Sequence, residues 1–144
     1  MDEPYHATMQ QLETLFQNDI SRVAIDRAHS LISNTWLRQV QHEEMLLTAQ
    51  KINRLLQEND ADKLLLSALQ MGSLLPETKE WLSTTYYKSL SEIGIKKLAR
   101  VLPQNLFNKL SFEAVVTRAE ALGNIDFEVQ NFTSDEAALR WLRL

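Results

Sequence analysis

Histidine, acidic and hydroxyl side chains could carry chemistry in this chain, and their spacing decides which chemistry is feasible. The three histidines, His6, His29 and His42, fall on separate segments, and only His42 has neighbouring carboxylates, at Glu43 and Glu44. A zinc-protease helix needs two histidines four residues apart so that both face one metal ion. His42 has no such partner. We therefore interpret it as part of a helix start, where the helix dipole favours acidic neighbours.

Hydroxyl nucleophiles and phosphate-binding loops also lack their required context. A nucleophile elbow has glycines on both sides of its serine and a later acid and histidine, whereas Gly72-Ser73 has one glycine and no histidine follows position 42. The remaining glycines, Gly94 and Gly123, are too far apart for a Walker or dinucleotide loop. The chain has no cysteine, which excludes thiolate catalysis and cysteine metal sites. We expect no enzymatic activity, no metal and no cofactor.

The composition is that of an ordinary globular protein, with 44% hydrophobic and 24% charged residues. A net charge of −4 argues against a general nucleic-acid binder, which needs a basic face. We interpret Lys96, Lys97 and Arg100 as the solvated edge of a strand. The apolar runs are too short for stable membrane insertion, and the acidic start, Met1–Pro4, lacks a signal-peptide pattern. We expect a cytoplasmic protein with one domain over residues 1–144.

The first part of the chain predicts a hairpin followed by a helix. Arg22–Ile25 and Leu31–Leu37 have strand character and a polar turn between them, which favours antiparallel pairing. Residues 1–11 could be a loosely ordered lead segment. Around their end, Met9, Leu12 and Phe16 would suit a helix, whereas Leu12, Thr14 and Phe16 would suit a strand. Helical periodicity then runs over His42–Glu58.

The second part of the chain predicts alternating strands and helices. The predicted strands are Lys63–Leu69, buried on both faces, Lys96–Leu102 and Phe127–Phe132. The predicted helices are Pro76–Glu92 with Gly94 as its stop, Ser111–Leu122 with Ser111 as N-cap, and Thr133–Leu142 with a Thr133–Glu136 capping box. Because parallel strands need crossover helices, we expect an α/β fold with a mixed sheet of five or six strands and about four helices.

Two places could bind a partner or ligand. The loop Gln70–Leu75 follows the carboxyl end of the central strand, where α/β proteins bind ligands and partners, and it leads into a helix N-terminus that favours an anion. The candidate partner or regulatory residues are Ser67, Gln70, Met71, Ser73 and Thr78. We expect Met71, Leu74 and Leu75 to form an exposed apolar surface for a phosphorylation-sensitive or acidic partner. The alternative is that Leu74 and Leu75 turn inward and the loop is merely structural.

The second place is a candidate apolar pocket formed by aromatic side chains. Trp36, Trp81 and Tyr86 could line a pocket for a small apolar ligand. Aromatic residues more often serve as core anchors, since each buries a large area. We favour the core interpretation over the pocket.

The order of elements, together with short landmarks along nearly the whole chain, resembles the STAS-like (SpoIIAA-like) fold. The chain is most similar to small, mostly uncharacterised bacterial STAS-domain proteins. The landmarks are Thr14–Asp19, Thr35–Leu37, Pro76–Trp81, Gly94–Ala99 and Ala137–Leu142.

This resemblance implies a non-enzymatic regulatory or protein-interaction domain similar to anti-sigma-factor antagonists. Those proteins are switched by phosphorylation of a serine at the start of the helix after the central strand. The corresponding stretch here, Leu74–Glu77, has no hydroxyl at that position, and nearer relatives carry an aspartate where Ser67 stands. A protein partner is implied, and a homodimer stays open. Relatedness to CRAL-TRIO lipid-transfer domains implies the alternative, a binder of a small apolar ligand or lipid.

Overall fold

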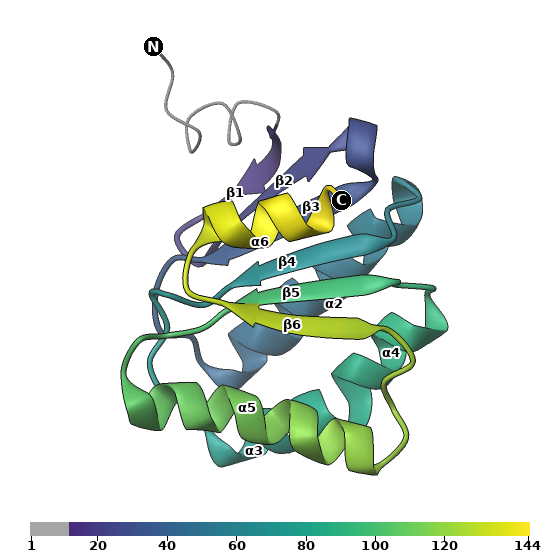
Figure 1. The fold of residues 1–144 in the computed structure, drawn as a ribbon. Helices are drawn as coiled ribbons and strands as arrows, with labels where there is room; N and C mark the ends of the chain where they lie inside the picture. Colours follow the sequence, from purple (N-terminus) through teal and green to yellow (C-terminus); the bar gives the residue numbers. More distant parts are fainter. Residues whose placement is uncertain (1–11) are drawn as a thin grey trace.

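The computed structural model describes residues 12–144, which form a mixed six-stranded sheet in which every strand lies beside its neighbour in sequence (Figure 1). Three strands pair antiparallel and the later ones continue in parallel. The strands are β1 (Glu13–Gln17), β2 (Ser21–Asp26), β3 (Leu31–Trp36), β4 (Lys63–Ser67), β5 (Lys97–Val101) and β6 (Glu128–Phe132). The predicted α/β class and the change from antiparallel to parallel pairing are confirmed.

Helices cover both faces of this sheet, but unequally. The larger layer contains α2 (His42–Glu58), a continuous helix made of α3 (Pro76–Trp81), η2 (Leu82–Tyr86) and α4 (Tyr87–Glu92), and α5 (Leu106–Ala121). The opposite face carries α6 (Asp135–Leu142), drawn in yellow in Figure 1. A short 3-10 turn, η1 (Arg27–His29), joins β2 to β3. None of the described helices is long and apolar enough to cross a membrane.

Alternation along the strands divides the buried residues into two cores. Ile32, Leu64 and Leu98 face the larger helical layer. Their strand neighbours Leu31 and Leu65 face α6. Because β4 lies between β3 and β5, successive residues of it are buried on opposite faces, as expected for a central parallel strand.

The α6 layer is fixed by a buried ion pair as well as by its apolar side chains. Asp26, at the end of β2, accepts a hydrogen bond from Arg143 Nε at 2.8 Å, and His29 Nδ1 lies 2.8 Å from the same carboxylate oxygen. Burial opposes ionisation of Asp26, but the hydrogen bonds from Arg143 and His29 outweigh it and hold the pKa of this carboxyl below its usual range. The pair connects the helix after the last strand to the hairpin near the start of the sheet.

The start of α2 matches its sequence signal. His42–Glu58 is helical as predicted, and Gln41 and Glu44 form a reciprocal capping box at its start. Arg38 donates to both oxygens of Glu44, at 3.1 and 2.8 Å. This contact, with the backbone N–H of Gln41, lowers the pKa of Glu44 to about 2.

Two predicted helix starts are wrong. The helix α5 begins at Leu106, because Asn105 accepts hydrogen bonds from the backbone of Phe107 and Asn108 and thereby caps it. Ser111 lies inside this helix, and its hydroxyl is buried without a partner among the described residues. The helix α6 is capped by Ser134 in place of Thr133.

The predicted helix Pro76–Glu92 exists but contains a π turn, η2. A π turn is wider than an α turn, and such turns are frequent at functional sites. Here Tyr86 and Tyr87 are both buried although they are adjacent in sequence. The turn therefore directs two consecutive tyrosines into the core. The expectations for residues 1–11, Met9 included, lie outside the described residues, whereas Thr14 and Phe16 lie in β1, as the strand alternative predicted.

Candidate interaction surface

The loops that follow β4, β5 and β6 meet at the carboxyl-terminal edge of the parallel strands. Backbone hydrogen bonds join Ala68 to Val101 at 2.8 Å and Leu102 to Phe132 at 3.3 Å. The hydroxyl of Ser73 also donates to Asn108 Oδ1 at 2.5 Å, which ties the loop after β4 to the first turn of α5. This edge is where open α/β sheets bind their ligands and partners.

The structure brings two of the five predicted loop residues to the surface. Gln70 and Ser73 are exposed, whereas Ser67, Met71 and Thr78 are at most 3% exposed. Thr78 Oγ1 lies 2.9 Å from His42 Nδ1, so this hydroxyl connects α3 to α2.

The expected exposure of Met71 and Leu74 is wrong, because the loop folds its apolar side chains inward. Gln39 holds this conformation by accepting from the Gly72 N–H at 2.8 Å and donating to the Ser73 carbonyl at 3.0 Å. A Cβ at position 72 would lie 2.5 Å from the Gln39 oxygen, so a larger residue would force the Gln39 amide to shift. Leu74 is buried, as the alternative interpretation expected, but Leu75 remains 36% exposed.

Exposed apolar side chains nevertheless lie on the segments that follow β4 and β5, mostly in the first turns of α5. We call the exposed residues Leu69, Leu75, Leu106, Phe107 and Leu110 the carboxyl-end patch. Phe107 is 81% exposed and Leu106 63%. A groove of about 440 Å³ lies where the loop after β4 meets the start of α5. Sequence reasoning missed the α5 part because its prediction started that helix five residues later.

The carboxyl-end patch lies in a nearly charge-free part of the chain. Residues 67–76 contain no ionisable side chain and residues 102–112 contain one, Lys109, although the chain has 15 basic and 19 acidic residues. Depletion of charge around exposed apolar side chains is typical of the centre of a protein interface. Leu106 and Leu110 are four residues apart on α5 and therefore share one face of this helix.

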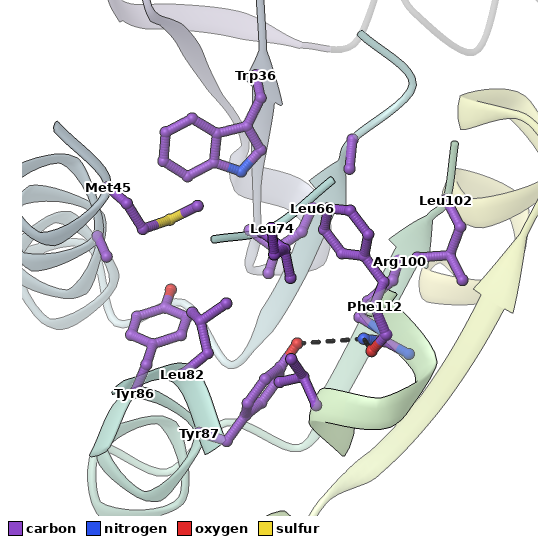
Figure 2. Close-up of a pocket in the computed structure, with 13 residues that line it drawn as sticks. Trp36, Met45, Leu66, Leu74, Leu82, Tyr86, Tyr87, Arg100, Leu102 and Phe112 are labelled. Carbon is purple, nitrogen blue, oxygen red and sulfur yellow. Dashed lines mark hydrogen bonds between the residues drawn. The ribbon is translucent and has the colours of Figure 1, made fainter. Parts of the chain in front are cut away.

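The aromatic residues proposed for a pocket are packed around a small void. Trp36 and Tyr86 line a cavity of about 30 Å³ in the larger core (Figure 2), whereas Trp81 stacks on Tyr86 at 5.5 Å between ring centroids and does not line it. Ligand pockets usually measure 300–1,000 Å³, and a void of this size has room for water only. Burial raises the pKa of the Tyr86 hydroxyl, which has no partner among the described residues. These aromatics therefore act as core anchors.

Arg100 does not lie on a solvated edge as predicted. The residue is 3% exposed, because β5 lies between β4 and β6 and its side chain points under α5. Its guanidinium donates to the carbonyl of Phe112 at 2.7 Å, to Asn131 Oδ1 at 3.0 Å and to the Tyr87 hydroxyl at 3.4 Å, the last marked in Figure 2. The strand order, which places this cation inside, could not be seen in the sequence.

The other two basic residues of that cluster behave differently. The side chain of Lys96 is 76% exposed and pairs with Asp62, and the ammonium of Lys97 lies 5.0 Å from the centre of the Trp141 ring. Among residues 12–144 no group of three or more metal-ligating side chains lies close enough together to hold a metal ion.

Comparison with protein-family models, with curated proteins and with solved structures gives no match to this chain.

Proposed function

We propose that this chain is a non-enzymatic protein-interaction domain of the regulatory type, which binds its partner at the carboxyl-end patch. The observation that carries the proposal is the combination of exposed Leu106, Phe107 and Leu110 with the low charge of residues 67–76 and 102–112, in which Lys109 is the single ionisable residue. An apolar surface of this kind is costly to leave in water, so a cognate partner gains free energy by covering it.

The chemistry of the surface indicates the kind of partner. Its apolar centre fits an amphipathic segment that presents two or three apolar side chains, because such side chains supply most of the binding energy in protein interfaces. Lys109 is exposed and belongs to no ion pair among the described residues. We therefore propose a partner segment with an acidic residue beside its apolar side chains.

The resemblance to STAS-like antagonists of bacteria supports the same proposal. In those proteins the regulatory serine lies at the start of the helix after the central strand, and here that helix, α3, begins beside Leu75. A cytoplasmic location and the absence of a nucleic-acid partner are part of the proposal. The alternative, a binder of a lipid or small apolar ligand in the core, loses support from the 30 Å³ cavity.

A crosslinking experiment in the host cell tests the proposal. A photo-crosslinking phenylalanine derivative at position 107 should capture a specific protein, whereas the same group at Leu47, which is 69% exposed on α2, should not capture it. The captured protein is then purified, and its Kd for the unmodified domain is measured.

Matched variants decide whether the carboxyl-end patch is the binding site. The double variant Leu106→Gln/Phe107→Gln should weaken binding at least about tenfold, while Leu47→Gln should leave the Kd within about twofold. Equal affinities of both variants would refute the proposed site. Sedimentation of the domain alone addresses the homodimer: a dimer that dissociates in the double variant would show that a second copy, and not a separate partner, covers the patch.

A further inference from the structure

A second surface, which shares no lining residue with the carboxyl-end patch, lies between α5 and the outer strand β6. Residues of both elements and of β5 enclose a groove of about 270 Å³. Its lining residues are Arg100, Glu113, Val116, Thr117, Glu120, Ile125, Phe127, Val129 and Asn131. The groove combines a cation, two carboxylates and an apolar wall, and the proposed protein-interaction function uses none of these groups.

The cation in this groove has no counter-charge. Arg100 is 3% exposed and belongs to none of the ion pairs formed by residues 12–144. Its Nε and Nη1 atoms donate to neutral oxygens of Asn131, Phe112 and Tyr87, and Nη2 has no acceptor in the described part of the chain. A buried charge left without an opposite charge is strongly unfavourable. An anionic ligand could therefore bind at Nη2, because no carboxylate of the described residues lies within 4 Å of the guanidinium to compete with it.

The carboxylates stand on the other wall of the groove. Glu113 and Glu120 are seven residues apart on α5, so they lie two turns apart on the same helix face as Val116 and Thr117. Neither of them forms an ion pair within residues 12–144. These groups suit an ammonium group, and they line the same groove as Arg100 without pairing with it, so a ligand in the groove meets both signs of charge.

Apolar residues form the third part of the groove lining, beside the cation and the two carboxylates. Val129 of β6 faces the same side of the sheet as Arg100, because Leu98 pairs with Val129 and Arg100 with Asn131 in the parallel register. Ile125 and Phe127 precede β6 and line the same groove. A ligand that matches the whole groove is small and carries one negative charge, one positive charge and an apolar body.

We propose that this groove binds a free α-amino acid with an aliphatic side chain. The carboxylate of the amino acid contacts Arg100 Nη2 and the side-chain amide N–H of Asn131, and its ammonium group contacts Glu113 or Glu120. The aliphatic side chain of the ligand packs on Val129 and Phe127. This site is independent of the proposed protein interaction, and either can fail without the other.

Three related probes test the charge requirements in solution. L-leucine carries both charges, L-leucinamide lacks the carboxylate and 4-methylpentanoate lacks the ammonium group. In an NMR titration of the full chain, L-leucine should shift the amide signals of Glu113, Val129 and Asn131 in a saturable way. The other two probes should bind at least about tenfold more weakly. No saturable shift up to about 10 mM L-leucine would overturn the proposal. Equal binding of acetate would overturn it as well, since Arg100 would then attract any anion.

A variant that changes the site while retaining the fold provides the second test. Asn131→Asp places a carboxylate beside Arg100, so it should keep or raise the melting temperature and weaken L-leucine binding at least about tenfold. Gln130→Asp is the matched control, because it introduces the same charge at the adjacent exposed residue on the opposite sheet face. The control should bind L-leucine within about twofold of the natural chain.

The carboxylate wall is tested separately. Glu113→Gln/Glu120→Gln should weaken L-leucine binding and leave 4-methylpentanoate unchanged, because only the amino acid carries an ammonium group. If instead the role of Glu113 is to neutralise Arg100, this variant would lower the stability of the fold and leave the preference for L-leucine over 4-methylpentanoate intact. That result, or unchanged L-leucine binding by the Asn131→Asp variant, would refute the proposed site.

Discussion

At the amino ends of the parallel strands Asp62 pairs with both Lys63 and Lys96, at 3.1 and 3.5 Å. At their carboxyl ends, residues 67–76 and 102–112 together contain one ionisable residue, Lys109. The same amino-terminal edge holds the Asp26–Arg143 pair. Charged groups that are paired or hydrated are stable at a surface in contact with water, so covering them with a partner is not required for stability. The neutral, apolar carboxyl-terminal edge gains free energy when it is covered. The paired charges of the amino-terminal edge thus support the fold, whereas the carboxyl-terminal edge is the one at which we propose that a partner binds.

Removing the buried ion pair should have the largest effect on stability. Asp26→Ala leaves Arg143, whose side chain is 11% exposed, without its carboxylate. We expect a loss of about 3 kcal/mol in the free energy of unfolding, measured by urea denaturation. Glu13→Ala is the control, because its pair with Arg27 is exposed on both sides and should contribute less than about 1 kcal/mol. Equal effects of the two substitutions would contradict a special role for the amino-terminal edge.

Acid should remove part of the same stabilisation. The pKa of Asp26 is lower in the folded protein than the ordinary value of 3.8, so folding favours the ionised carboxylate. Its contribution is fully present above pH 3.8 and is lost as the pH falls through the folded pKa. The difference in unfolding free energy between the natural chain and Asp26→Asn should therefore shrink as the pH falls below about 4. A difference that grows in acid would show that the sign is wrong.

The start of α5, which carries most of the carboxyl-end patch, can be tested through its cap. Asn105→Ala removes the side chain that accepts from two backbone N–H groups and should cost about 1 kcal/mol. Ser111→Ala should cost nothing or stabilise slightly, because the Ser111 hydroxyl is buried without a partner among the described residues. The opposite ranking in urea denaturation would place the helix start at Ser111.

The smallest effect should come from the carboxyl-end patch itself. Leu106→Gln/Phe107→Gln should change the free energy of unfolding by less than about 0.5 kcal/mol, since both side chains are largely exposed. This stability measurement belongs with the binding measurement on the same variant. A loss of about 2 kcal/mol or more would mean that these residues support the fold, and the contrast between the two edges would disappear.

The sequence predicted the elements whose residues repeat with a clear period. The hairpin and α2 have such patterns, and their positions agree closely with the prediction. The start of α5 was missed because Leu106, Phe107 and Leu110 do not belong to its inward stripe, and a helix turn with apolar residues on its outer side has no amphipathic signal. The outward-facing apolar residues that obscure the helical period of this turn are also the residues on which the proposed binding surface rests.

Whether the candidate site residues are exposed or buried depends more strongly on contacts between distant parts of the chain. Met71 directly follows the exposed Gln70 in sequence. Hydrogen bonds from Gln39, more than thirty residues earlier, hold the loop so that Met71 points into the core. Arg100 has the same local pattern whether its strand lies at an edge or in the middle of the sheet, and only the position of β6 decides between them. Pairings over such distances leave no local trace in the sequence.

The sequential strand order also bears on how the chain is assembled during synthesis. Each new strand adds to the edge left by the one before it, so the sheet can grow in the order in which the ribosome delivers it. The face that α6 covers, with Leu31, Leu65 and Ala99, stays open until that helix has been made. Arg143 then joins Asp26 across 117 positions of the chain. We therefore expect nascent chains that lack α6 to be the form most exposed to chaperones and to aggregation.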